Sequence, residues 1–156
     1  MTTTYLGNIE LLKQPKTAFL ASSTIPTDMV LRCYDWAQQM SREKQCVISG
    51  FSSHLEQRVL HFLMKGSGPI VLVLARRLYK HIPKELQPLI DNGRLLIIST
   101  STALRQSRAT AFVRNHYVCE QANHIILIEA NQESSLAQLR TEFNYKLREL
   151  YTDDTQ

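Results

Sequence analysis

The sequence has few cysteines and glycines, and it lacks the common phosphate-binding and catalytic motifs. Its 3 cysteines, Cys33, Cys46 and Cys119, form no C-x-x-C pair, which excludes a metal knuckle and a disulfide framework. The 5 glycines form neither G-x-x-x-x-G-K-[ST] nor G-x-S-x-G, and Gly66-Ser67-Gly68 precedes a strand pattern instead of following one. The usual nucleotide-loop and serine-hydrolase motifs are therefore absent.

Metal-ligand spacing and long apolar runs are also missing. The 5 histidines do not form H-x-x-x-H, so we expect no metal site and no cofactor. Apolar runs stay far below the length of a membrane span, and Met1 to Tyr5 lack the basic and apolar regions of a secretory signal. We therefore expect no membrane association and a cytoplasmic location.

The composition is that of an ordinary globular chain. With 156 residues, 44% of them hydrophobic and 21% charged, the chain is long enough to bury a core in one domain. We expect a lead-in segment at 1–15, the domain itself at 16–151 and a frayed tail at 152–156. The net charge of +4 suits a binder of polyanions but is too small to identify one.

Short runs of branched apolar residues alternate with segments of helical spacing. We expect strands at 16–22, 45–49, 70–74, 95–99 and 125–129, and helices at 27–44, 53–65, 83–92, within 104–121, and at 134–150. This rhythm is typical of βαβ units. The sequence therefore predicts an α/β fold: a Rossmann-like, doubly wound, mainly parallel sheet of about five or more strands with helices on both faces.

Hydroxyl-rich loops follow several predicted strands. The candidate phosphate-binding residues in them are Ser22, Ser23, Ser49, Gly50, Ser52, Ser53, Ser134 and Ser135. Each loop precedes a helix, where unpaired backbone N–H groups and the positive helix end favour anions. The alternative is that the serines only cap helices, and the S-x-x-E spacing of Ser53 and Glu56 favours a capping box.

Basic residues gather at two further places. Arg76, Arg77 and Lys80 follow the third strand, and Arg105, Arg108 and Arg114 precede the last one, with Tyr79 and Tyr117 as candidate stacking faces. Single-stranded nucleic acid is bound by such combinations, because phosphates need cations and unpaired bases need flat partners. The alternative is that these charged residues only form solvent-exposed helix faces and bind no ligand.

Several landmarks in collinear order resemble the Rossmann-like domain of the DprA/Smf (DNA processing protein A) family. They are Gly7-Asn8-Ile9-Glu10-Leu11-Leu12, Lys16 to Ser23, Val47-Ile48-Ser49-Gly50, Arg114-Asn115-His116 and Ile125 to Ala130. The resemblance spans most of the chain. It implies a binding module and not an enzyme, since the family binds single-stranded DNA, forms homodimers and helps to load a recombination protein.

The chain is a divergent member by this comparison. Ala21-Ser22-Ser23 stands where the family has Gly-Ser-Arg, and His54 replaces a second glycine after Gly50. Arg-Asn-Arg becomes Arg114-Asn115-His116, and Ser-Gly-Ser becomes Glu133-Ser134-Ser135. The Pro-Gly-Gly-x-Gly-Thr loop of the related phosphoribohydrolases is missing after Ile128.

Two functional hypotheses follow. The first is a non-catalytic binder of single-stranded DNA, with Arg114, Asn115 and the 49–53 turn lining a pocket and Arg76, Arg77, Lys80, Arg105, Arg108 and His116 extending it as a nucleic-acid surface. The alternative is a sensor or hydrolase of a small nucleotide-like ligand, with Glu129 or Glu133 near the ribose. A third reading, a ligandless interaction protein, stays open.

Overall fold

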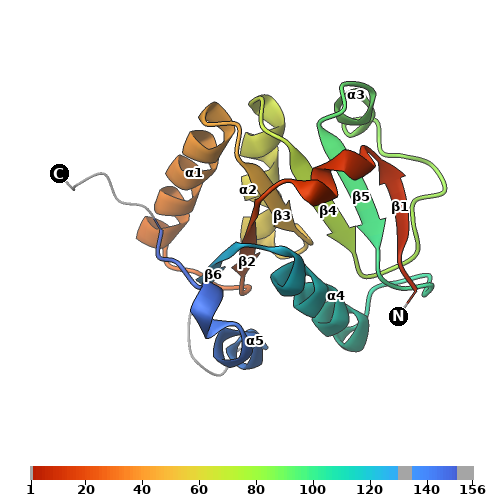
Figure 1. Cartoon of the computed structure of the whole chain (residues 1–156). Helices are drawn as coiled ribbons and strands as arrows, with labels where there is room; N and C mark the ends of the chain where they lie inside the picture. The colour runs from red at the N-terminus through yellow and green to blue at the C-terminus, as the bar shows by residue number, and fades with distance from the viewer. Residues whose placement is uncertain (1, 130–134, 151–156) are drawn as a thin grey trace.

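The computed structural model describes residues 2–129 and 135–150 (Figure 1). Its strands are β1 Thr4–Gly7, β2 Lys16–Ala21, β3 Cys46–Ser49, β4 Ile70–Leu74, β5 Leu95–Ser99 and β6 His124–Ile128. Its α-helices are α1 Thr27–Arg42, α2 His54–Lys65, α3 Gln87–Asp91, α4 Arg108–Gln121 and α5 Ala137–Glu142, with short 3-10 helices η1 Ile9–Lys13 and η2 Asn144–Lys146.

The six strands form one sheet in the order β1-β5-β4-β3-β2-β6. The neighbouring strands from β5 to β6 in this order are parallel. Strand β1 lies at one edge of the sheet and pairs antiparallel with β5, with Thr4 opposite Ser99. Every residue of β4 and β5 is buried, as continuous aliphatic runs in a parallel sheet predict. The predicted Rossmann-like, mainly parallel sheet is confirmed.

Helices cover both faces of the sheet (Figure 1). On one face α1, α2 and α3 pack through apolar stripes at helical spacing, which include Trp36, Met40 and Val59. On the other face α4 and α5 pack through residues such as Val118 and Leu139. Successive strand residues alternate between the two cores, since side chains along a strand point to opposite faces.

The chain leaves the neighbouring strands β2 and β6 toward opposite faces of the sheet. The helix after β2, α1, belongs to the first layer, whereas α5, which follows β6, belongs to the second. In doubly wound sheets, ligands bind beyond the carboxyl ends of the strands where the connections diverge in this way. The fold therefore places the expected site next to the ends of β2 and β6.

Three elements differ from the expectation, the last of them only in length. The sequence predicts a lead-in segment before Lys16 and no strand, because Thr4–Gly7 form no apolar run; in the structure they form β1, whose residues are largely exposed. The single helix expected at 134–150 is wrong: α5 ends at Glu142, and the chain turns so that Leu147 bridges to Ile125 of β6. Lys146 Nζ stabilises this turn by donating to the carbonyls of Cys119 and Glu120, at 2.9 and 3.1 Å.

Among the described residues, no helix is long and apolar enough to cross a membrane.

The helix expected at 83–92 is shorter than predicted, since α3 covers only Gln87–Asp91. The predicted tail at 152–156 lies outside the described residues, and the expected domain limits of 16–151 stay a prediction.

Candidate functional site

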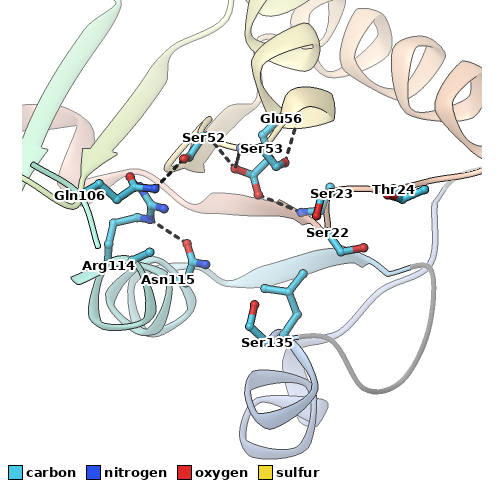
Figure 2. A pocket seen from close by; sticks show the side chains of 13 residues that line it. Ser22, Ser23, Thr24, Ser52, Ser53, Glu56, Gln106, Arg114, Asn115 and Ser135 are labelled. Carbon is cyan, nitrogen blue, oxygen red and sulfur yellow. Dashed lines mark hydrogen bonds between the residues drawn. The ribbon is translucent and has the colours of Figure 1, made fainter. Parts of the chain in front are cut away.

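A cavity of about 620 Å³ lies beyond the carboxyl ends of β2 and β3, beside the first half of α4 (Figure 2). We call it the central cavity. It is lined by Ala21, Ser22, Ser23, Thr24, Ser52, Ser53, Glu56, Gln106, Ala111, Arg114, Asn115, Ser135 and Leu136. Its volume is within the range of about 300–1,000 Å³ that small-molecule sites occupy.

The turn after β3 is organised by the first residues of α2. Ser53 Oγ accepts from the Glu56 N–H at 3.4 Å, and Glu56 Oε1 accepts from the Ser53 N–H at 3.2 Å. The predicted capping box is confirmed. The Glu56 carboxylate also accepts from the Ser52 N–H at 2.8 Å and from the Ala21 N–H, at the end of β2, at 2.9 Å. Glu56 thus joins the ends of two strands.

Arg114 enters from α4 and is buried, with 3% of its surface exposed. Its Nε donates to Asn115 Oδ1 at 2.8 Å, and its Nη1 donates to the Val73 carbonyl at 3.3 Å. The guanidinium packs against Gly50, where a Cβ would lie 2.3 Å from Arg114 Cζ. Burial lowers the pKa of the Arg114 guanidinium, and the nearby Glu56 carboxylate raises it.

Most of the predicted pocket residues meet at this cavity. Those that line it are Ser22, Ser23, Ser52, Ser53, Arg114, Asn115 and Ser135. Ser49 and Gly50 are buried and do not line it. Ser49 Oγ instead accepts from the Phe51 N–H at 2.9 Å. Ser134 lies outside the described residues.

A second cavity of about 470 Å³, the outer cavity, adjoins the first at the start of α4. It is lined by Ser23, Arg108, Ala111, Phe112, Asn115 and Ser135, so it shares four of these residues with the central cavity. Arg108 is exposed, and Arg105 is exposed in the loop that leads to α4. Arg108 lines the outer cavity, and Arg105 directly precedes Gln106, which lines the central cavity.

The other predicted surface residues lie elsewhere. Arg76, Arg77 and Lys80 follow β4 and line neither cavity. Arg76 Cζ lies 5.4 Å from the centroid of the Tyr79 ring, so this candidate stacking face already contacts a cation. Tyr117 is 6% exposed within the core, and its predicted role as a stacking face is wrong.

His116 links α4 to α5 instead of lining either cavity. Its Nε2 lies 2.8 Å from Glu142 Oε2, and its Nδ1 lies 3.7 Å from Glu120 Oε1. Its ring packs edge-on against Phe143, with the ring centroids 5.1 Å apart. His116 therefore supports the helix pair that borders the site.

Gln106 lines the central cavity, although no sequence pattern predicts it. Its Nε2 donates to Ser52 Oγ at 3.0 Å, and its Oε1 accepts from Arg114 Nη1 at 3.5 Å. Gln106 thereby joins the 52–53 turn to α4. No pattern in the sequence could have found it, since Ser52 and Gln106 are 54 residues apart. Within residues 2–129 and 135–150, no group of three or more His, Cys, Asp or Glu side chains could hold a metal ion.

Comparison with protein-family models gives a match over nearly the whole chain. The model described as DNA recombination-mediator protein A matches residues 2–152. A search of curated proteins gave no match.

Several solved structures have a similar fold. DNA processing protein A (DprA) from Streptococcus pneumoniae has a TM-score of 0.74 at 20% identity, with 99% of this chain and 56% of that chain covered. DNA processing protein A from Helicobacter pylori, described with its single-stranded DNA binding mode, has a TM-score of 0.75 at 18% identity, with 99% and 74% covered. The molybdenum cofactor carrier protein of Chlamydomonas reinhardtii has a TM-score of 0.57 at 10% identity, with 87% and 74% covered. The chain thus spans little more than half of the Streptococcus pneumoniae protein.

Proposed function

Because the chain belongs to the family of DNA recombination-mediator protein A, we propose that it is a non-catalytic module that binds single-stranded DNA. The DNA occupies the central cavity and continues over its rim at Arg108 and Arg105. The related Helicobacter pylori protein is described as binding single-stranded DNA, and this supports the same ligand class here.

The observation that carries the proposal is the meeting of the predicted pocket residues at one cavity. Ser22, Ser23, Ser52 and Ser53 offer hydroxyl groups from two strand ends, and Asn115 offers a carboxamide from α4. The exposed guanidinium of Arg108 adjoins them. Cations beside hydrogen-bonding groups in a cleft are what a nucleic acid strand requires.

Fluorescence anisotropy of a labelled oligonucleotide at two salt concentrations tests the proposal. We expect binding that weakens as salt rises, because phosphate contacts release counterions. The slope of log affinity against log salt is negative, and Arg108→Ala should reduce its magnitude by about 0.7, the value of one phosphate contact on a single strand. Arg42→Ala is the matched control, since Arg42 is exposed at the end of α1 that leads into the amino end of β3, away from the carboxyl ends of the strands.

An unchanged anisotropy at low salt with micromolar protein would contradict the proposal. Thermal stabilisation by mononucleotides, without oligonucleotide binding, would instead support the alternative of a small-nucleotide sensor or hydrolase.

The proposal includes a cytoplasmic location, a homodimer and a recombination protein as partner, which the family resemblance implies. The three cysteines are free and buried, which agrees with a reducing compartment. Light scattering during size-exclusion chromatography tests the dimer directly.

A further inference from the structure

A groove runs between α1 and α2, which lie side by side on one face of the sheet (Figure 1). Near the C-terminal ends of the two helices it deepens into a cavity of about 440 Å³, which shares no lining residue with the central or the outer cavity. We call the whole feature the helix groove. Its borders are formed by Leu31, Tyr34 and Arg42 of α1 and by Arg58, Phe62 and Lys65 of α2.

The side of α1 that borders the helix groove carries an exposed apolar residue. Leu31, Gln38 and Arg42 recur at spacings of seven and four residues, so they lie on the same side of the helix. Leu31 is 56% exposed. It is the exposed large hydrophobic side chain of this helix pair, both members of which the structure describes in full. An apolar partner that covered Leu31 would therefore remove apolar surface from water.

Two aromatic rings form the middle of the helix groove. The ring centroids of Tyr34 and Phe62 are 4.7 Å apart, and Arg58 Cζ lies 5.4 Å from the centroid of the Tyr34 ring. Both rings are partly buried. These contacts already use ring faces that a nucleic acid base would need for stacking. The rings therefore add apolar surface to the groove more than they offer a stacking platform.

The deep end of the helix groove is preformed. Ser41 Oγ accepts from the Ser67 N–H at 2.9 Å, and Ser67 Oγ donates to the Ser41 carbonyl at 3.4 Å. A Cβ on Gly66 would collide with Ser41 Oγ, so this close approach requires glycine. The ends of α1 and α2 are thereby tied together. A ligand that binds here does not have to order them, which lowers the cost of binding.

The charges around the helix groove are mixed. Arg42, Arg58 and Lys65 are exposed on its borders, whereas the carboxylate of Asp35 is exposed one turn after Leu31 on α1. A nucleic acid strand carries a charge at every phosphate, so a strand laid along the groove would meet Asp35 as well as the cations. A peptide can place its carboxylates opposite the cations alone, which is how charge complementarity selects a protein partner.

We propose that the helix groove docks an acidic, amphipathic helix of a partner protein. Its apolar stripe packs on Leu31 and Phe62, and its carboxylates lie beside Arg42 and Lys65. The 12 residues of α2 span about 18 Å, which sets the length of the partner helix. Because α1 and α2 begin after β2 and β3 and run toward the amino ends of the strands, the deep end lies about a helix length from the central cavity. The partner helix and DNA can therefore bind at the same time, and the inference does not depend on the proposed function.

Fluorescence anisotropy of a synthetic peptide tests the proposal. The probe is a labelled helix of about 14 residues with leucines at i, i+3, i+4 and i+7 and glutamates on both flanks. The control peptide has the same composition in an order that spreads the leucines around the helix. We expect the probe to bind at least about tenfold more tightly than the control, because only a stripe can bury its leucines in the groove. Equal affinities, or no binding of either peptide at about 100 μM protein, would overturn the inference.

Matched substitutions locate the binding place. Leu31→Ser should weaken binding of the probe about tenfold, whereas Leu104→Ser, at a leucine that is 62% exposed in the loop before α4, should leave it unchanged. Lys65→Glu should also weaken the probe about tenfold, whereas Lys84→Glu makes the same change of net charge before α3 and should not. All four positions are exposed, and equal melting temperatures check that each variant folds. A groove substitution that acts no more strongly than its control would overturn the inference.

Other occupants of the helix groove give distinct results. If oligothymidylate displaces the probe, or if Lys65→Glu weakens oligothymidylate binding more than Lys84→Glu does, the groove is a nucleic-acid surface and the inference is overturned. A dimer that dissociates in Leu31→Ser, measured by light scattering, would show a second copy of this chain in the groove and would also overturn it. Undiminished binding of the probe by Arg108→Ala supports a separate site, so either proposal can fail while the other stands.

Discussion

The contact between Gly50 and Arg114 gives a prediction that tests how the site is built. An alanine Cβ at position 50 would lie 2.3 Å from Arg114 Cζ and 2.4 Å from Nη1, well inside the optimum of about 3.5–4.0 Å for carbon contacts. Within the described residues, the glycines with positive φ are Gly7 and Gly93, so the backbone at Gly50 accepts alanine without strain. The whole cost of Gly50→Ala must come from displacing the guanidinium.

That displacement breaks contacts of a buried charge. Arg114 would move away from the Val73 carbonyl and from Asn115 Oδ1, which lie at 3.3 and 2.8 Å. Overpacking of this kind costs about 1–3 kcal/mol of unfolding free energy. For a chain of this length, a loss of about 2 kcal/mol lowers Tm by about 4–8 °C. Urea unfolding followed by circular dichroism measures the change, and a thermal scan checks it.

A double-mutant cycle identifies the cause. In an Arg114→Ala background the clash is absent, so Gly50→Ala should cost no more than about 0.5 kcal/mol. If Gly50→Ala costs the same in both backgrounds, the guanidinium is not what the glycine accommodates, and the account of the cavity wall is refuted.

Two further predictions concern buried groups. In Glu56→Gln, an amide replaces one carboxylate oxygen, so the side chain can no longer accept from all three N–H groups of Ala21, Ser52 and Ser53. The unfolding free energy should fall by about 1–3 kcal/mol. An unchanged urea midpoint would contradict the role of Glu56 as a clamp, the side chain that joins the ends of β2 and β3. Burial raises the pKa of Cys33, Cys46 and Cys119 from 9.0 to about 12, so the native chain should resist alkylation at pH values where the denatured chain reacts fully. The contribution of these buried neutral thiols to the unfolding free energy is complete below pH 9.0 and is lost as the pH rises toward about 12. Alkylation of the native chain at the rate of the denatured chain would contradict this prediction.

The fold could be predicted because its strands are strongly patterned. Ile70–Leu74 and Leu95–Ser99 are uninterrupted apolar runs, and burial on both faces leaves them few alternatives to a central parallel strand. The capping box of Ser53 and Glu56 could be found for the same reason, since it depends on residues three apart. Local patterns therefore located the elements that carry the site.

The parts that could not be predicted depend on distant contacts. Strand β1 is exposed and forms only by pairing with β5, and the chain after α5 turns because Lys146 and Leu147 contact α4 and β6. The same holds for the role of Glu56 as a clamp, because the Ala21 N–H that it accepts from is 35 residues away. The burial of Arg114 likewise follows from the position of Gly50 in space and not from spacing along the chain.

The central claim, that the cavity beyond β2 and β3 receives the DNA strand, is tested most directly by NMR. Titration of isotope-labelled protein with a short oligothymidylate should shift the backbone amides of Ser23, Thr24, Ser52, Asn115 and Ser135, which border that cavity. Amides near Arg42 and Gly66, at the amino ends of β3 and β4, should stay unchanged. Shifts confined to the amino ends of the strands, or no shifts at saturating oligonucleotide, would contradict the account.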